Sequence, residues 1–219
     1  MSSSENPPAR FASPPCFMHE VDDQYAGIPQ VDVQTAGDVA RWRKGERKRL
    51  IDERMEVPAE RRARAAERIA DRLTSETGTV GDLFLGIYWP FRGEPDLRDW
   101  GRQAIDRGAR LALPVVVEKA KPLVFRRWAP GVKLEKGVWN IPVPAGGEIV
   151  IPNIIIAPLV GFDEAGFRLG YGGGFYDRTL AALPSKPLTI GVGFGFARLK
   201  TIFPQWHDIP LDRLIIEDV

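Results

Sequence analysis

The residues with the clearest chemical potential lie in one short stretch, 168–178, which reads RLGYGGGFYDR. Gly170 and Gly172 to Gly174 can turn their backbone N–H groups towards an anion, because no side chain blocks the approach. Arg168 adds a fixed cation at the start of the stretch. The pattern therefore indicates binding of a phosphate-bearing ligand.

An acid, Asp177, follows the glycines at a point where a lone carboxylate would repel a bound phosphate. A bridging Mg²⁺ resolves this conflict, because that ion is commonly held by one or two carboxylates together with phosphate oxygens. The stretch has neither the ending of a Walker A loop nor the spacing of a dinucleotide fingerprint. The structural alternative is a glycine-rich hairpin corner in which Asp177 caps a helix.

The elements around the stretch place the glycines between strands and the start of a helix. Residues 153–158 (NIIIAP) predict a buried strand, and 159–170 predict a hairpin whose turn holds Asp163, Glu164 and Gly166. Residues 175–183 (FYDRTLAAL) predict a short helix. A helix N-terminus supplies unpaired N–H groups and partial positive charge, so this order suits an anion site.

The rest of the chain after Gly81 alternates strand and helix signals. A helix is predicted over 95–108, and further strands are predicted at 83–89, 111–117, 122–128, 188–194 and 214–217. Such alternation favours parallel pairing of strands. We therefore expect an α/β protein, a three-layer α/β/α sandwich with a mainly parallel central sheet.

Two basic helices are predicted ahead of the first strand, over 38–55 with Asp38 as the cap and from Pro58 to about Ser75. Acids interleaved with the basic residues favour an ion-paired surface over a nucleic-acid face. Residues 1–37 lack apolar periodicity and predict a poorly ordered or surface-strapping N-terminal extension, with 38–219 as a single domain.

The composition limits which classes of partner and which cellular compartment we expect for this protein. Thirty basic and 29 acidic residues give a net charge of +1, so no global field indicates a nucleic acid or a membrane. Cys16 is the only cysteine, which favours a reducing compartment. Cys16, His19 and Glu20 have metal-like spacing, but too few further ligands follow for a structural zinc site. We expect a soluble, cytoplasmic monomer without a nucleic-acid or membrane partner.

The segment 158–178, PLVGFDEAGFRLGYGGGFYDR, strongly resembles the signature of the 5-formyltetrahydrofolate cyclo-ligase family, also called 5,10-methenyltetrahydrofolate synthetase. Similar features occur in the expected order at WRKGERKRL (42–50), YWPFRGEPDL (88–97), VWNIPVP (138–144) and HDIPLDRLI (207–215). The resemblance covers residues 38–218. It implies an α/β/α sandwich and conversion of 5-formyltetrahydrofolate to 5,10-methenyltetrahydrofolate with ATP and Mg²⁺, releasing ADP and phosphate.

The resemblance also implies roles for individual residues. It implies ATP contacts from the first helix and the glycine loop, at Arg41, Arg43, Lys44, Arg168, Leu169, Gly170, Tyr171, Gly172, Gly173, Gly174, Phe175 and Tyr176. It implies folate contacts at Trp89, Glu94, Trp139, Tyr171, Gly172, Gly173, Gly174 and Phe175. It implies metal ligands at Asp177 and Asp208, and catalytic roles for Arg168 and Tyr176.

Several of these residues have a structural alternative. Glu94 also suits the start of the following helix, Asp208 a turn, and the two tryptophans, Trp89 and Trp139, a hydrophobic core. The family pattern carries a lysine four residues before the arginine that Arg43 matches, and this chain has Val39 there. Arg41 or Lys44 would then replace that lysine.

The chemistry implied by the resemblance needs ATP because a formyl oxygen is a poor leaving group until it is phosphorylated. Positioning and charge neutralisation suffice for such a transfer, in keeping with a chain that has two histidines and no evident catalytic triad. Two other functions stay open. One is a non-catalytic folate- or nucleotide-binding regulator on the same fold, and the other is a nucleic-acid-binding module that uses the basic helices.

Overall fold

The computed structural model describes residues 33–219. The candidate metal spacing at Cys16, His19 and Glu20 lies outside the described residues, and the domain boundary between 37 and 38 stays a prediction. The chain divides at Val39 and Ala40 into two units, and the second, Ala40–Val219, contains the sheet and the cavities. No helix in the described part of the chain is both long and apolar enough to cross a membrane.

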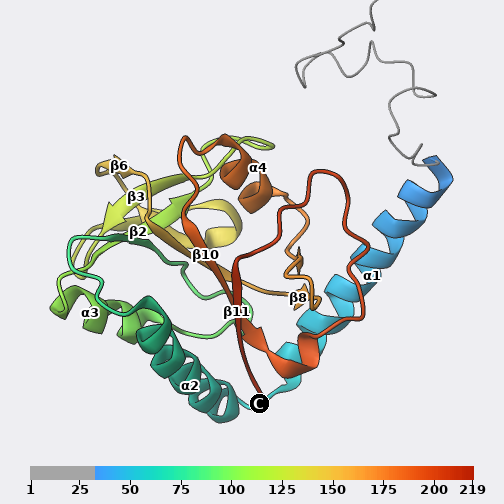
Figure 1. Ribbon diagram of the computed structural model, residues 1–219, viewed down its shortest axis with the longest axis horizontal. Coiled ribbons are helices and arrows are strands. Elements are labelled where there is room, and N and C mark those ends of the chain that lie inside the picture. Colours follow the sequence, from blue (N-terminus) through green and yellow to red (C-terminus); the bar gives the residue numbers. More distant parts are fainter. Residues whose placement is uncertain (1–32) are drawn as a thin grey trace, which may run out of the picture. The chain divides into compact units, whose positions relative to one another are not determined.

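A seven-stranded sheet forms the centre of the second unit, in the order β11-β10-β7-β1-β2-β3-β6 (Figure 1). The strands are β1 (Phe84–Gly86), β2 (Arg110–Val115), β3 (Val124–Trp128), β6 (Ile149–Val150), β7 (Ile154–Pro158), β10 (Leu188–Phe194) and β11 (Arg213–Glu217). From β11 to β2 all neighbours run parallel, whereas β3 and β6 add an antiparallel edge. The mainly parallel sheet is therefore confirmed.

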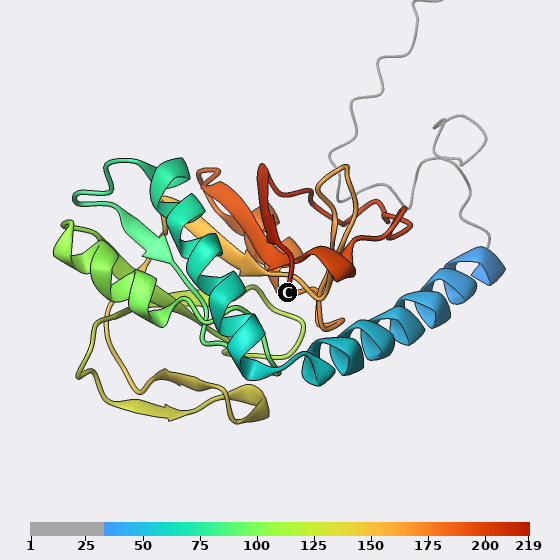
Figure 2. The same ribbon diagram turned by 90° about the horizontal axis from the view of Figure 1, so that it is seen from below.

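Helices cover both faces of this sheet, which confirms the three layers. Helices α2 (Ala59–Thr77) and α3 (Arg98–Asp106) pack on one face, where Ile69 and Trp100 share a core with Ile154. Helix α4 (Phe175–Ala182) packs on the other face, where Leu180 contacts the cluster around Ile155. Figure 2 shows α2 and α3 side by side on the same side of the sheet. Because both faces are covered, β7 can be an apolar run of consecutive buried residues.

Two predicted helix starts differ from the structure. Helix α1 spans Val33–Glu56, so Asp38 lies inside it and is not its cap. Residues 33–37 contain no proline, so nothing there stops the helix. Helix α3 begins at Arg98 rather than Pro95, where Asp96 Oδ1 accepts the Arg98 N–H at 3.1 Å. Glu94 therefore does not begin that helix. Helix α2 starts directly after Pro58, as predicted.

The order of the strands places a crevice at the centre of the sheet. After β1 the chain passes through α3 to β2 on one side, and after β7 it passes through α4 to β10 on the other. In such sheets ligands bind outside the carboxyl ends of the strands where the direction of winding reverses. Two hairpins border this region: β8 (Gly161–Phe162) with β9 (Arg168–Leu169), and β4 (Leu134–Lys136) with β5 (Pro142–Pro144).

Candidate active site

A cavity of about 280 Å³ lies at the carboxyl ends of β1, β2 and β7. One part of its wall, the polar end, is formed by Arg43, Arg47, Arg168, Asp177, Asp208 and the glycine loop, residues 170–174. Another part, the aromatic end, is formed by Tyr88, Trp89, Phe91, Glu94, Trp139 and Tyr171. Residues far apart in the sequence are thus brought to one cavity.

The three consecutive glycines of the glycine loop, Gly172 to Gly174, occupy positions where a side chain would be strained or would clash. Gly172 and Gly174 have positive φ angles of 90° and 60°, and a Cβ at Gly173 would lie 2.6 Å from the ring of Phe175. Gly174 is the N-cap of α4. The N–H groups of Gly172 to Gly174 form no hydrogen bond with another residue in the range 33–219. The loop therefore presents unpaired donors at a helix N-terminus, as the sequence predicts for an anion site.

Arg168, which is buried, and Asp177, which is partly buried, form an ion pair beside the loop. Arg168 Nη2 donates to Asp177 Oδ1 at 2.8 Å, and its Nη1 donates to the Ile209 carbonyl oxygen at 3.0 Å. The Ile209 N–H also donates to Asp177 Oδ1, at 3.1 Å. Both contacts of Asp177 with described residues use Oδ1, which leaves Oδ2 available. A carboxylate oxygen on the wall of a cavity is a donor that Mg²⁺ accepts, so the residues fit this ion.

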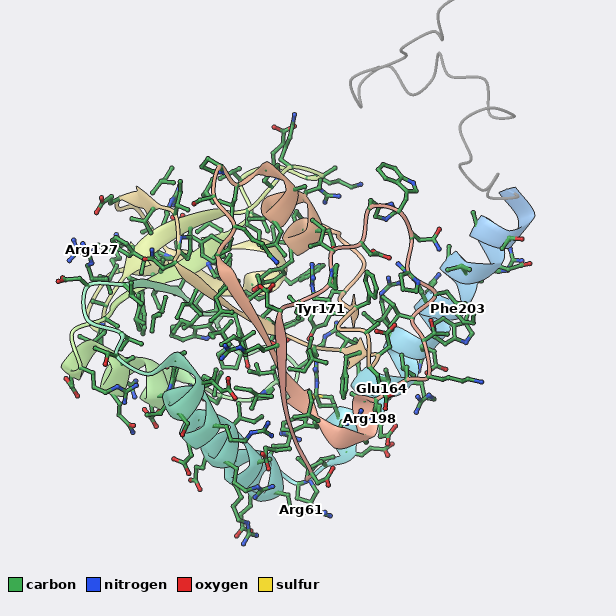
Figure 3. All side chains as sticks on the ribbon, viewed as in Figure 1. Arg61, Arg127, Glu164, Tyr171, Arg198 and Phe203 are labelled. Atoms are coloured by element: carbon green, nitrogen blue, oxygen red, sulfur yellow. The ribbon has the colours of Figure 1, made fainter. Side chains whose placement is uncertain are left out.

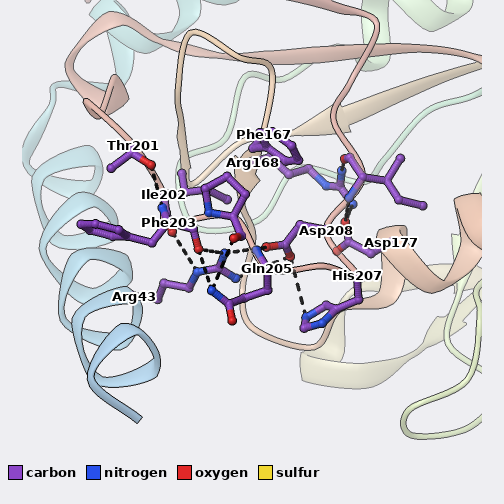
Figure 4. Close-up of polar contacts among 12 residues, drawn as sticks. Arg43, Phe167, Arg168, Asp177, Thr201, Ile202, Phe203, Gln205, His207 and Asp208 are labelled. Carbon is purple, nitrogen blue, oxygen red and sulfur yellow. Dashed lines mark hydrogen bonds and ion pairs between the residues drawn. The ribbon is translucent and has the colours of Figure 1, made fainter. Parts of the chain in front are cut away.

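Asp208 is held by a second arginine, Arg43, from α1 (Figure 4). The Arg43 Nη2 to Asp208 Oδ2 distance is 2.5 Å, and the Gln205 N–H donates to the same oxygen at 2.7 Å. Burial raises the pKa of Asp208, but these hydrogen bonds together with the charges of Arg43 and His207 outweigh it and hold the pKa below its usual value. Among the described residues no group of three or more potential protein ligands surrounds a metal position, so a metal here would also need phosphate oxygens.

Arg47 is a cavity residue that the sequence interpretation missed. Its Nε donates to the Gly170 carbonyl oxygen at 2.7 Å, and its guanidinium lies against Gly172. Burial, followed by the charge of Arg43, lowers the pKa of Arg47. No carboxylate of residues 33–219 lies within ion-pair distance of it. A bound anion would therefore offset both the loss of hydration of Arg47 and its repulsion by Arg43.

The predicted basic residues of α1 divide into two groups. Arg43 lines the cavity, whereas Arg41 and Lys44 are exposed and are not part of its wall. Arg43 and Arg47 are four residues apart, one helical turn, so both face the cavity. This i, i+4 spacing was the signal in the sequence that could have identified Arg47.

Glu94 is the buried acid of the aromatic end, with 6% of its surface exposed. Its Oε2 accepts the Phe91 N–H at 2.9 Å and its Oε1 accepts the Tyr171 hydroxyl at 3.0 Å. Arg54, itself buried, donates to the Tyr171 hydroxyl at 2.6 Å. Burial raises the pKa of Glu94 to about 7, although the charge of Arg54 and the two hydrogen bonds oppose the rise. Arg54 was also missed in the sequence.

Aromatic rings line the same end of the cavity. Phe91 and Trp139 are stacked, with centroids 6.1 Å apart and 7° between planes, and Tyr171 contacts both. Trp139 is 51% exposed and has φ of 57°, a costly backbone for a tryptophan. Trp139 is therefore a cavity residue and not a core residue. Trp89 combines the two roles, because it lines the cavity and also packs edge-on against the core residue Trp128.

The other residues around the loop that were predicted to bind ligand differ in whether their side chains face the cavity or the core. Phe175 and Tyr176 line the cavity, and burial raises the pKa of the Tyr176 hydroxyl. Leu169 is 1% exposed and belongs to the core cluster around Phe162, so its side chain does not reach the cavity. Alternation along β9 explains the difference, because Arg168 and Leu169 face opposite ways. Figure 3 shows Arg61 and Arg127 projecting at the periphery, whereas Tyr171 is half-buried.

Comparison with known proteins identifies similar chains. The model of the 5-formyltetrahydrofolate cyclo-ligase family matches residues 39–217. The Escherichia coli K12 5-formyltetrahydrofolate cyclo-ligase is 33% identical over 169 residues, which cover 74% of this chain and 93% of that protein. The corresponding Mycolicibacterium smegmatis protein is 29% identical over 174 residues, covering 76% of this chain and 89% of its own.

Two solved structures are also similar. The Aquifex aeolicus 5,10-methenyltetrahydrofolate synthetase superimposes with a TM-score of 0.68 and 29% identity, covering 80% of this chain and 89% of that one. The Mycoplasma pneumoniae 5,10-methenyltetrahydrofolate synthetase gives a TM-score of 0.64 at 20% identity, covering 79% of this chain and 97% of that one. The second likeness concerns the fold alone.

Proposed function

The chain belongs to the 5-formyltetrahydrofolate cyclo-ligase family, and from this we propose that it converts 5-formyltetrahydrofolate to 5,10-methenyltetrahydrofolate with ATP, releasing ADP and phosphate. One observation carries the proposal: a single cavity joins a cationic glycine loop to an aromatic wall with one buried acid. These two ends suit the two substrates, a polyphosphate and a planar pterin. That the protein is a soluble, cytoplasmic monomer stays a prediction.

The polar end suits the triphosphate of ATP. The unpaired N–H groups of Gly172 to Gly174 and the start of α4 attract phosphate oxygens. Arg43 and Arg47 add cations, of which Arg47 has no carboxylate partner in the described part of the chain. Asp177, with Asp208 as the second candidate, would hold Mg²⁺ together with those oxygens, and the ion would neutralise phosphate charge.

The aromatic end suits the pterin ring of the folate. Phe91, Trp139 and Tyr171 supply ring faces, and stacking favours a flat heterocycle between them. Glu94 is an acceptor for the N–H groups at a pterin edge. Because its pKa is about 7, near-neutral solution holds it partly ionised, and a donor ligand would favour the carboxylate form.

The chemistry begins when the formyl oxygen attacks the γ-phosphorus of ATP and ADP leaves. The N10 nitrogen then attacks the formyl carbon and loses its proton, and the carbon–oxygen bond breaks as phosphate departs. Arg168 lies in the cavity wall and offsets negative charge on the transferred group. Tyr176 stays protonated because burial raises its pKa, so it acts as a hydrogen-bond donor and not as a base.

The decisive experiment follows methenyl product by absorbance after the protein is mixed with Mg-ATP and 5-formyltetrahydrofolate. Product that requires both substrates supports the proposal. Measurable binding of both ligands without product would instead identify the chain as the non-catalytic regulator. Tight RNA binding that weakens steeply with salt, again without product, would favour the nucleic-acid-binding module.

The metal role of Asp177 is tested by Asp177→Asn, which removes the charge but keeps an oxygen for Arg168 and Ile209. We expect loss of Mg²⁺-dependent turnover by on the order of 100-fold or more. The melting temperature falls as well, because the buried Arg168 loses its charged partner, so turnover is compared at a temperature at which both proteins are folded. Asp212→Asn is the matched control, because Asp212 pairs with Lys186 and Thr189 and lines neither cavity. Unaltered turnover in Asp177→Asn would refute the role.

A further inference from the structure

Trp206 is the most exposed large apolar side chain in the described residues, at 89%. An indole buries 150–250 Å² when it is covered, so leaving it in water forgoes a large stabilisation. The side chain makes no contribution to the core clusters of the range 33–219. Its indole face is therefore accessible to a ligand.

The backbone that carries Trp206 is anchored. Residues 205–208 form a turn in which the Asp208 N–H donates to the Gln205 carbonyl oxygen at 2.9 Å, and the Gln205 N–H donates back to Asp208 Oδ2 at 2.7 Å. Arg43 fixes the same carboxylate (Figure 4). The ring of His207 lies edge-on to Trp206, with centroids 5.1 Å apart at 87°. Trp206 is thus presented at the tip of a fixed turn.

A second cavity, of about 540 Å³, lies beside Trp206. Its wall shares Gly172 to Gly174, Asp177 and His207 with the first cavity, and adds Arg178, Ala181, Trp206 and Ile209. A ligand whose phosphates lie on the glycine loop in the first cavity can therefore extend past Asp177 and His207 into the second. The aromatic end of the first cavity lies on another part of the wall, so the two cavities can hold different parts of the substrate pair.

We propose that the second cavity receives the nucleoside of the bound nucleotide and that Trp206 is the stacking platform for its base. The identity of the ligand as a nucleotide rests on the proposed function. A nucleobase has two flat faces and stacks well on an indole, largely irrespective of which base it is. Of the charged groups on this wall, Asp177 accepts from Arg168, and Arg178 donates to the Gly173 carbonyl oxygen. Trp206 offers the largest ring face on the wall, so we assign the base to stacking on its indole.

The test compares binding of Mg-ATP and of inorganic tripolyphosphate with Mg²⁺, which has no base, to the full chain by calorimetry. In Trp206→Ala the Kd for ATP rises roughly 5- to 150-fold, the range that alanine substitution gives for loss of one stacked base. The Kd for tripolyphosphate changes by less than about twofold. Trp206→Phe recovers most of the ATP affinity, and GTP follows ATP in all three proteins.

Trp139→Ala is the matched control, because Trp139 is also an exposed indole on a cavity wall but belongs to the aromatic end. It weakens binding of 5-formyltetrahydrofolate and leaves the Kd for ATP unchanged. The opposite responses of the two variants separate a base platform from a general effect of losing a surface tryptophan.

Three outcomes overturn the assignment. An unchanged ATP Kd in Trp206→Ala excludes the platform while the proposed function stands. An equal weakening of ATP and tripolyphosphate shows that Trp206 only shapes the glycine loop. If the wild-type chain turns over no substrate and binds neither ATP nor tripolyphosphate, the proposed function fails together with the inference.

Discussion

The two ends of the first cavity manage buried charge in opposite ways. At the polar end Arg168 pairs with Asp177 and Arg43 with Asp208, at 2.8 and 2.5 Å. At the aromatic end Glu94 is nearly fully buried, and its partners are the Phe91 N–H and the Tyr171 hydroxyl. Arg54 contacts the Tyr171 hydroxyl and not Glu94 itself. The pairing of Asp208 holds its pKa below its usual value, whereas burial raises that of Glu94 to about 7.

This contrast indicates what each end is built to receive. The polar end neutralises its own acids and still has a cation without a carboxylate partner in the described part, Arg47, so a polyanion completes it. The aromatic end contains an acid that burial destabilises, so a ligand that donates hydrogen bonds completes it. Each end would thus be stabilised by the substrate that we propose for it.

The largest expected effect tests whether Arg168 does more than neutralise Asp177. Arg168→Lys keeps the charge but loses the fork that reaches both Ile209 and Asp177. We expect kcat to fall on the order of 10²–10³-fold, the usual result of removing one transition-state donor. Arg72→Lys, at the exposed pair with Glu217, is the control. A near-normal kcat in Arg168→Lys would reduce Arg168 to a structural partner.

The next effect is a gain in stability at the aromatic end. The folded-state pKa of Glu94 is raised from 4.5 to about 7, so its ionisation in the folded protein costs stability that grows from about pH 4.5 and levels off above pH 7. Glu94→Gln removes that cost, which is at most ~3 kcal/mol at pH 8 and under ~1 kcal/mol at pH 5. Denaturant unfolding at both pH values measures the difference. An equal change at the two would show that Glu94 is not destabilised by burial.

The same substitution should weaken folate binding. Loss of a hydrogen bond to a charged acceptor costs about 1.5–3 kcal/mol, so the KM for 5-formyltetrahydrofolate rises roughly 10- to 100-fold in Glu94→Gln while that for ATP is unchanged. Glu164→Gln is the control, because Glu164 is exposed in the β8–β9 turn (Figure 3). A rise in the ATP KM of similar size would mean that the two ends are not separate.

The sequence predicted the polar end better than the aromatic end. The glycine loop, Arg168 and Asp177 are contiguous, so local rules for strands, turns and helix starts sufficed to place them. Arg54, Tyr171 and Glu94 come from three distant segments, and only the folded chain shows that they form one hydrogen-bonded series. Contacts between such distant segments produce no regular spacing in the sequence from which they could be predicted.

Helix α1 shows a different limit of prediction from the sequence. Its length was underestimated, since Asp38 satisfies the preferences of a cap but lies within the helix. Its basic residues were too numerous for composition to separate those in the cavity from those in solvent. Helical periodicity carries that information once one member is fixed, because Arg43, Arg47 and Arg54 recur at intervals of four and seven on one face.

The smallest expected effect sharpens the contrast along that helix. Arg47→Ala removes the cation that lies against Gly172 and should raise the KM for ATP roughly 10-fold, the lower end for a charge-assisted hydrogen bond. Lys44→Ala removes an exposed cation three residues earlier and should change that KM by less than about twofold. Steady-state kinetics of both variants decide the point. If Lys44→Ala has the larger effect, the nucleotide approaches α1 from its solvent face, and the polar end is not the site of its phosphates.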